Sequence, residues 1–330
     1  MNQRRALMLA VGASALTAPL ASFAQAPAHP SGKPWRVGIL PGGPLPPRQF
    51  QWDAFRERMH TQGYVEGRNV QYEYRPPASE GAPLDALAAD LVRLNVDVIV
   101  AAASLAIAAA KKATQRIPIV MCPSSDPVAL GFITSLRQPG GNITGVNIQH
   151  EETTGKRMQL LREMVPKASR IAFMWSTFTG KLQLEAAEIA APQLGVQLLA
   201  LEMGAADALA ALFDAAVKAR AGALLVAQTP FSFGLRAQIT ALALKHRLPS
   251  MYSTAANTVA GGLMSYGPND SDYYRQAAVF VDKIFKGRKP ADLPVEQPLK
   301  WELVINMKTA KALGMTVPPV VLLQAEREIE

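Results

Sequence analysis

The 330-residue chain contains a single cysteine, Cys122, which excludes a disulfide framework and any cysteine-clustered zinc or iron–sulfur site. Charged residues make up only 18% of the sequence and hydrophobic residues 49%, a balance that excludes a disordered chain. The only long apolar run starts at residue 6, and the body of the chain therefore contains no candidate transmembrane helix. A chain of this length can bury a large core and form two medium-sized domains.

The sequence also lacks the common catalytic signatures. It contains no G-x-S-x-G elbow, no Walker loop, no G-x-G-x-x-G and no H-E-x-x-H motif. None of the four histidines has a partner at metal-ligand spacing; they are His29, His60, His150 and His246. The sequence therefore predicts no catalytic residue, no metal site and no cofactor, and it favours a binding protein over an enzyme.

Basic residues exceed acidic ones, with 34 Lys and Arg against 26 Asp and Glu, which gives a formal net charge of +8. They are scattered along the chain and form no stripe with interleaved aromatic residues. Nucleic-acid binding is therefore not predicted, and the basic groups are expected on solvated helix faces.

The N-terminus has the features of a signal peptide covering residues 1–26. Arg4 and Arg5 precede an apolar core from Ala6 to Leu20, and small residues offer a cleavage site after Ala24 or Ala26. The core is too short for a stable membrane anchor. The residues that flank the arginine pair match a twin-arginine signal poorly, which favours the general secretory route. No cysteine follows the core for lipid attachment, and the predicted location is therefore the periplasm.

From residue 36 the chain alternates short apolar runs with longer segments of helical periodicity. Strands are predicted at 36–40, 70–74, 96–100 and 117–121, and helices at 48–62, 84–94 and 104–114. Continuous apolar strands that alternate with helices indicate a parallel sheet covered on both faces.

The same order of elements recurs after about 130 residues. The matching apolar runs lie at 170–175, 194–199, 222–227 and 247–251, and a further strand between turns is predicted within 261–268. Two similar α/β lobes explain this repeat better than one large sheet, although a single sheet has partly the same strand–helix pattern.

Two such lobes direct the carboxyl ends of their strands toward a shared cleft, where ligands of open α/β sheets bind. Ser104 is predicted to cap a helix whose free N–H groups suit a carboxylate, or to be a plain cap. Asp126 caps the next turn or meets an ammonium group. Aromatic rings can stack on a flat ligand or cage a cation. The candidate ligand-binding residues are Ser104, Ser124, Ser125, Asp126, Trp175, Phe178, Gln228, Phe231 and Tyr252.

Four segments resemble those of a bacterial family of ABC-transporter substrate-binding proteins. They are Gly63–Val70 (GYVEGRNV), Ser125–Val128 followed by Arg137–Gly145 (RQPGGNITG), Gly261–Gly267 (GGLMSYG), and Leu293–Pro298 followed by Val304–Gly314. The likeness spans the mature chain in order. Members of this family are often labelled as tryptophan/tyrosine uptake components.

The resemblance implies a type I periplasmic binding protein fold, in which two Rossmann-like lobes with parallel sheets are joined by a hinge of three crossovers. Lobe 1 would comprise residues 34–147 and lobe 2 residues 148–264, each with part of 265–330. By the same resemblance Ser104 and the Ser124-Ser125 loop would hold a ligand carboxylate and Asp126 would meet an amine.

One segment departs from the family pattern. Many relatives carry Trp-Asn-Pro after the first strand of the second lobe, whereas Trp175 is followed here by Ser176, Thr177 and Phe178. Because this segment is expected to face the cleft, the identity of the ligand is not inherited from the family.

The leading interpretation is a monomeric protein that captures a small ligand, an amino acid with or without an aromatic side chain, by hinge closure and passes it to an ABC permease and its ATPase. A sensor subunit for a membrane receptor would use the same closure. An exported two-lobed enzyme would need a nucleotide-binding or acid–base constellation, and none is found. A repressor-type ligand domain is disfavoured by the export signal and by the absence of a helix-turn-helix segment.

Overall fold

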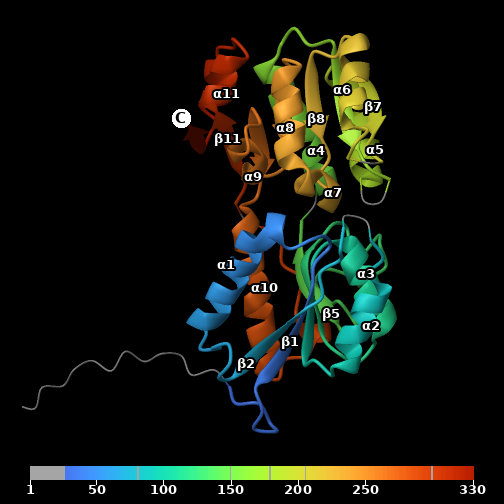
Figure 1. The fold of residues 1–330 in the computed structure, drawn as a ribbon, viewed down its shortest axis with the longest axis vertical. Coiled ribbons are helices and arrows are strands. Elements are labelled where there is room, and N and C mark those ends of the chain that lie inside the picture. The colour runs from blue at the N-terminus through green and yellow to red at the C-terminus, as the bar shows by residue number, and fades with distance from the viewer. Residues whose placement is uncertain (1–26, 80–81, 149, 178–179, 205, 299) are drawn as a thin grey trace, which may run out of the picture.

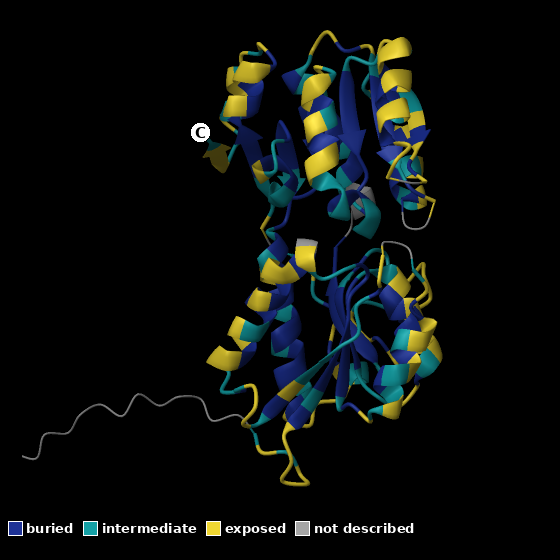
Figure 2. Cartoon of the chain, in the orientation of Figure 1, coloured by how far each residue is buried: buried dark blue, intermediate teal, exposed yellow. Residues whose placement is uncertain are grey.

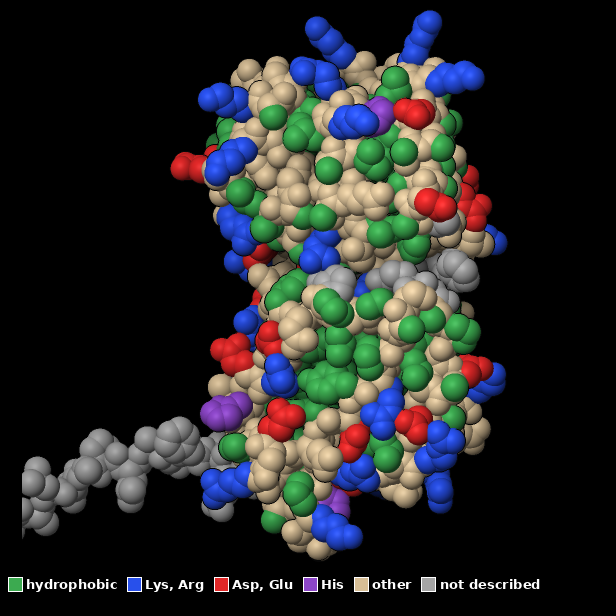
Figure 3. Space-filling model, viewed as in Figure 1, with side chains coloured by type: hydrophobic (Ala, Val, Ile, Leu, Met, Phe, Trp, Pro, Cys, Tyr) green, Lys and Arg blue, Asp and Glu red, His purple; other side chains and the backbone are tan. Residues whose placement is uncertain are grey.

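The computed structural model describes residues 27–79, 82–148, 150–177, 180–204, 206–298 and 300–330; the predicted signal peptide and its cleavage sites lie outside the described residues. The chain forms two lobes stacked along the long axis, each built from a sheet covered by helices, with a narrower region between them (Figures 1 and 3). The prediction of two α/β lobes, rather than one large sheet, is confirmed.

The first lobe contains a five-stranded parallel sheet in the order β2-β1-β3-β4-β5. Its strands are β1 (Trp35–Leu40), β2 (Val70–Tyr74), β3 (Val98–Ala101), β4 (Ile119–Ser124) and β5 (Ile143–Asn147). Its helices are α1 (Gln49–Thr61), α2 (Asp85–Arg93), α3 (Ser104–Ala113) and α10 (Asp270–Phe285), with the short 3-10 turns η1 (Pro46–Arg48) and η2 (Pro290–Asp292).

Alternation along the strands explains why this sheet is apolar throughout. Val98 and Val100 pack in one hydrophobic cluster with α1 and α10, while Ile99 and Ala101 pack in a second cluster with α2 and α3. Successive side chains of a strand point to opposite faces, and both faces of this sheet are covered. Figure 2 shows the result in both lobes: the strands are buried and the outer faces of the helices are exposed.

The second lobe contains a seven-stranded sheet in the order β12-β11-β10-β9-β8-β6-β7, in which only the β10–β11 pair is antiparallel. Its strands are β6 (Arg170–Trp175), β7 (Gln197–Glu202), β8 (Ala223–Val226), β9 (Ser250–Tyr252), β10 (Met264–Gly267), β11 (Glu302–Asn306) and β12 (Arg327–Ile329). Its helices are α4 (His150–Met164), α5 (Lys181–Gln193), α6 (Leu209–Lys218), α7 (Pro230–Gly234), α8 (Arg236–Lys245), α9 (Ala255–Val259), α11 (Met307–Ala312) and α12 (Pro319–Leu322).

The chain passes between the lobes three times: from β5 to α4, from β10 to α10, and from η2 to β11. The second crossover returns α10 to the first lobe, where it packs along α1 (Figure 1). An isolated bridge between Val146 and Glu296 joins the segments that lead into the first and third crossovers. These connections bring the carboxyl ends of the strands of both lobes to one region.

Two further observations bear on function. In the part of the chain that the structure describes, no helix is both long and apolar enough to cross a membrane. On the face that Figure 3 shows, Lys and Arg side chains lie interspersed with Asp and Glu side chains over both lobes.

Candidate functional site

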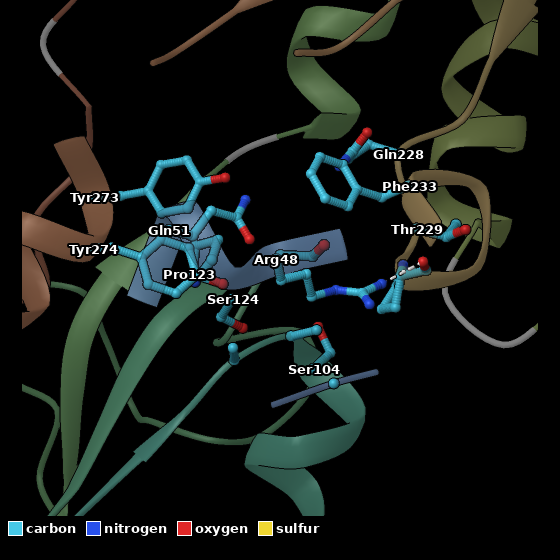
Figure 4. Close-up of a pocket in the computed structure, with 15 residues that line it drawn as sticks. Arg48, Gln51, Ser104, Pro123, Ser124, Gln228, Thr229, Phe233, Tyr273 and Tyr274 are labelled. Carbon is cyan, nitrogen blue, oxygen red and sulfur yellow. Dashed lines mark hydrogen bonds between the residues drawn. The ribbon is translucent and has the colours of Figure 1, made fainter. Parts of the chain in front are cut away.

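A cavity lies between the lobes at the carboxyl ends of β1, β3 and β4 on one side and of β8 on the other (Figure 4). Its empty volume is about 640 Å³, which includes space open to solvent. Small-molecule sites lie preferentially at domain interfaces. The cavity is therefore the candidate ligand site.

Arg48, the last residue of η1, places a guanidinium in this cavity (Figure 4). The side chain is only 5% exposed, and its Nη1 donates to the carbonyl oxygen of Pro44 at 3.0 Å. Its Nη2 donates to the carbonyl oxygen of Pro230 at 2.5 Å, and Pro230 belongs to the second lobe. The guanidinium carbon also lies 5.5 Å from the ring centroid of Phe233. Arg48 therefore brings a positive charge to the cavity and links the two lobes.

Ser124 and the first turn of α3 lie on the first-lobe side. Ser124 ends β4, is 1% exposed, and its Oγ has no hydrogen-bond partner among the described residues. Ser104 is the first residue of α3, and Ala103 occupies the N-cap position with a φ of 72°. The prediction that Ser104 itself is the N-cap is therefore wrong. Because an alanine side chain accepts no hydrogen bond, the first N–H groups of α3 remain available to an acceptor in the cavity.

The close approach of β1 to this turn depends on Gly42. A Cβ atom at this position would lie 2.6 Å from the carbonyl oxygen of Ala102 and 2.8 Å from the Cβ of Ala103. Both distances are shorter than van der Waals contact allows, and the site therefore requires glycine here.

Aromatic rings line the cavity from both lobes. Tyr273 and Tyr274 of α10 lie on one side and Phe233 of α7 lies across from them (Figure 4). Burial raises the pKa of both tyrosines well above the ordinary value, which keeps them neutral. These rings offer flat apolar surfaces to a ligand.

Two glutamine side chains add neutral polar groups. Gln51 of α1 is buried, and Gln228 follows β8 in the second lobe. The backbone of Gln228 is fixed by Gln183, whose Nε2 donates to its carbonyl oxygen at 2.9 Å and whose Oε1 accepts from its N–H at 3.0 Å. These two bonds hold the loop while the Gln228 side chain lines the cavity. A side-chain amide can both donate and accept hydrogen bonds.

Four of the residues predicted from the sequence meet at this cavity: Ser104, Ser124, Ser125 and Gln228. Asp126 does not line it. Its Oδ1 accepts from the N–H groups of Val128 at 3.1 Å and Ala129 at 3.0 Å, the capping role that the sequence left open.

The predicted aromatic residues that the structure describes lie elsewhere. Tyr252 is 1% exposed in the core of the second lobe, and Phe231 packs against the same cluster. Trp175 packs against the other hydrophobic cluster of that lobe. Phe178 lies outside the described residues. The rings that line the cavity are those of Phe233, which the sequence left as possible helix core, and of the two tyrosines of α10.

Asp270 lies next to this site, at the start of α10, and is 6% exposed. The Oη of Tyr273 donates to its Oδ1 at 2.6 Å. Burial raises the pKa of Asp270 from 3.8 to about 6, a change that corresponds to about 3 kcal/mol of stability. Because the folded state binds the proton more tightly than the unfolded state, this contribution is greatest below pH 3.8 and is lost as the pH rises through 6.

We expect Asp270→Asn to remove this pH dependence. The free energy of unfolding of the wild type, measured by urea denaturation, should fall relative to that of the variant by about 2 kcal/mol between pH 4 and pH 7. Asp272→Asn is the matched control, since the Asp272 side chain lies two residues away on the same helix and is 64% exposed. A constant difference between wild type and Asp270→Asn at every pH would contradict the prediction.

Comparison with known proteins places the chain among transport proteins. The sequence model of the family described as "ABC transporter substrate binding protein" matches residues 46–329. A tyrosine-binding protein of Clostridioides difficile (strain R20291) is 23% identical over 267 residues, which cover 79% of this chain and 76% of that protein.

Solved structures show the same fold. An ABC domain in complex with L-Trp from Streptococcus pneumoniae has a TM-score of 0.82 and 23% identity, and the match covers 90% of this chain and 100% of that one. The ligand-free, open structure of a Clostridium difficile substrate-binding protein with adhesive properties has a TM-score of 0.66 and 22% identity. That match also covers 90% of this chain and 100% of the other. These likenesses confirm the two-lobed type I periplasmic binding protein fold.

Proposed function

The chain belongs to the ABC transporter substrate-binding protein family, and from this premise we propose that it captures a small carboxylate-bearing solute between its lobes and delivers it to an ABC permease. The family consists of substrate-binding proteins, not enzymes, which confirms that part of the sequence prediction. An amino acid or a related aromatic carboxylate is the ligand class that the site suits best.

The composition of the cavity carries this proposal. A buried guanidinium, the hydroxyl of Ser124 and the first turn of α3 converge on the first-lobe side, and all three suit a carboxylate. The aromatic rings beside them suit an apolar or aromatic side chain. The tyrosine-binding relative and the tryptophan complex support the same ligand class.

Capture by hinge closure is the proposed mechanism. The lobes touch across the cavity through the hydrogen bond from Arg48 to Pro230, and the rings of Phe50 and Phe233 lie 6.4 Å apart. The higher TM-score with the tryptophan complex than with the ligand-free open structure is in keeping with a closed arrangement. A ligand that contacts both lobes shifts an open–closed equilibrium toward the closed form.

The partners and location follow from the same proposal. We expect a permease and its ATPase to accept the ligand from the closed form. We also expect the signal peptide within residues 1–26 to be cleaved, and the mature protein to act as a monomer in the periplasm. A sensor subunit for a membrane receptor is the alternative, since it would use the same closure.

Isothermal titration calorimetry of the mature protein against the twenty amino acids and aromatic carboxylates tests ligand capture. We expect heat with at least one aromatic carboxylate, together with a smaller radius of gyration by X-ray scattering. No binding across the panel would contradict the proposal. Deletion of the gene should abolish uptake of the radiolabelled ligand, whereas unchanged uptake with a lost transcriptional response would favour the sensor.

A further inference from the structure

Gln51, in the first turn of α1, is a buried polar side chain that lines the ligand cavity. The residue is only 4% exposed, and no described residue exchanges a hydrogen bond with its side-chain amide. Two other buried side chains of α1, those of Trp52 and Phe55, are apolar and belong to the hydrophobic core of the first lobe. Because a buried amide without a partner is unfavourable, we expect the polar atoms of Gln51 to meet a ligand that enters the cavity.

The position of this amide indicates which part of a ligand it would contact. In Figure 4 the amide points into the space between the two tyrosines of α10 and Phe233, the rings that offer flat apolar surfaces. The proposed place of the carboxylate is different, at Ser124 and the first turn of α3. A polar group among aromatic rings therefore faces the ring of the ligand and not its carboxylate.

Tyr273 supplies a second acceptor on the same side of the cavity. Its hydroxyl donates to Oδ1 of Asp270 at 2.6 Å, which leaves the lone pairs of its oxygen free to accept a hydrogen bond. The Oε1 of Gln51 is also an acceptor. Both groups fit a donor on the ligand, such as a phenol O–H or an indole N–H, whereas a ring without a donor would leave the desolvated amide unpaired.

We infer that Gln51 is a specificity-determining residue whose amide, together with the Tyr273 hydroxyl, recognises an O–H or N–H donor on the aromatic ring of the ligand. The inference rests on the proposed function and narrows it from aromatic carboxylates in general to those whose ring carries such a donor. An unpaired buried amide lowers affinity on the order of tenfold to a hundredfold, which sets the expected discrimination.

Matched ligands test this inference by calorimetry. The pairs are L-tyrosine with L-phenylalanine, 3-(4-hydroxyphenyl)propionate with 3-(4-fluorophenyl)propionate, and L-tryptophan with 1-methyl-L-tryptophan. In the pair that binds best, the member with the donor should bind at least tenfold more tightly than the member without it. A smaller ratio, or the reverse order, would overturn the inference and leave the proposed function standing. Absence of binding by every one of these compounds would overturn both.

Substitution of Gln51 tests the cause. Gln51→Met removes the amide and keeps an unbranched side chain that a helix accepts well, so the affinity ratio of the best pair should fall at least fivefold, through weaker binding of the donor-bearing member. Gln49→Met makes the same change at an exposed position of the same helix and should leave the ratio unchanged.

A second variant, Gln51→Leu, removes the amide in another way and is measured beside Gln51→Met. The melting temperature of each variant reports folding. A wild-type ratio in either Gln51 variant that remains folded would overturn the inference.

Discussion

Replacing Arg48 by methionine is expected to weaken binding of the tightest carboxylate ligand by about 100-fold, or about 3 kcal/mol. The substitution keeps an unbranched apolar stem and removes the buried guanidinium, which the cavity offers to the carboxylate. It also removes the hydrogen bond to Pro230 in the second lobe, which favours the closed arrangement. Calorimetry gives the dissociation constant, and X-ray scattering shows whether the ligand still compacts the protein.

Arg236→Met is the matched control. Its guanidinium carbon lies 4.6 Å from the ring centroid of Phe233, the same ring that Arg48 approaches, but Arg236 does not line the cavity. Arg236 also donates to the carbonyl oxygen of Phe233 at 2.9 Å. We expect the ligand affinity of the variant to stay within threefold of the wild type, because no charge that lines the cavity is lost. Similar losses in both variants would show that the arginines act through Phe233, and would contradict a direct role for Arg48.

The fold was largely predictable because periodicity and turn residues are local signals. The strands at 70–74 and 170–175 lie where the sequence predicted them. The segment 194–199, predicted as a helix end that leads into a second strand, contains the C-cap of α5 and the start of β7, Gln197–Glu202. Gly195, with a φ of 64°, completes the end of α5, and the N–H of Val196 still donates to Ala191 of that helix. Because a glycine in the left-handed region terminates the helix at this point, the strand begins only at Gln197.

The site was only partly predictable, because topology places some of its residues and packing selects the others. Ser104 and Gln228 follow strands and Ser124 ends one, and the carboxyl ends of parallel strands meet at one edge. Tyr252 also ends a strand, but side chains of a strand alternate between its faces. Met251 packs on one side of the sheet and Tyr252 on the other, which leaves the Tyr252 ring in the core.

The remaining cavity residues lie in segments that do not directly follow a strand, so the expectation that ligands bind at the carboxyl ends of strands does not identify them. Arg48 belongs to a short 3-10 turn, and Tyr273 and Tyr274 belong to a helix that returns from the second lobe to the first. Arg48 and its partner Pro230 are 182 residues apart in the sequence. Only the three-dimensional arrangement of the crossovers brings these groups together, and the only sequence signal for Arg48 was its position shortly after the first strand.

Gly267→Ala is expected to destabilise the protein by about 3 kcal/mol or more and to lower the melting temperature by roughly 6 °C or more. Gly267 ends β10, immediately before the crossover to α10. A Cβ atom there would lie 1.7 Å from the carbonyl oxygen of Ser253, a backbone atom next to β9. Since β9 and β10 are hydrogen-bonded neighbours in the sheet, relief of this overlap requires the strands to separate. Circular dichroism during thermal and urea unfolding measures the loss.

Gly141→Ala provides the comparison for this prediction. A Cβ atom at Gly141 would meet no other atom within 4 Å, and its backbone is outside the left-handed region. The added methyl group should therefore change stability by less than about 0.5 kcal/mol. Equal melting temperatures for the two variants would refute the steric explanation. A large loss confined to Gly267→Ala would establish that the β9–β10 pairing, which leads directly into the second crossover, tolerates no side chain at its last residue.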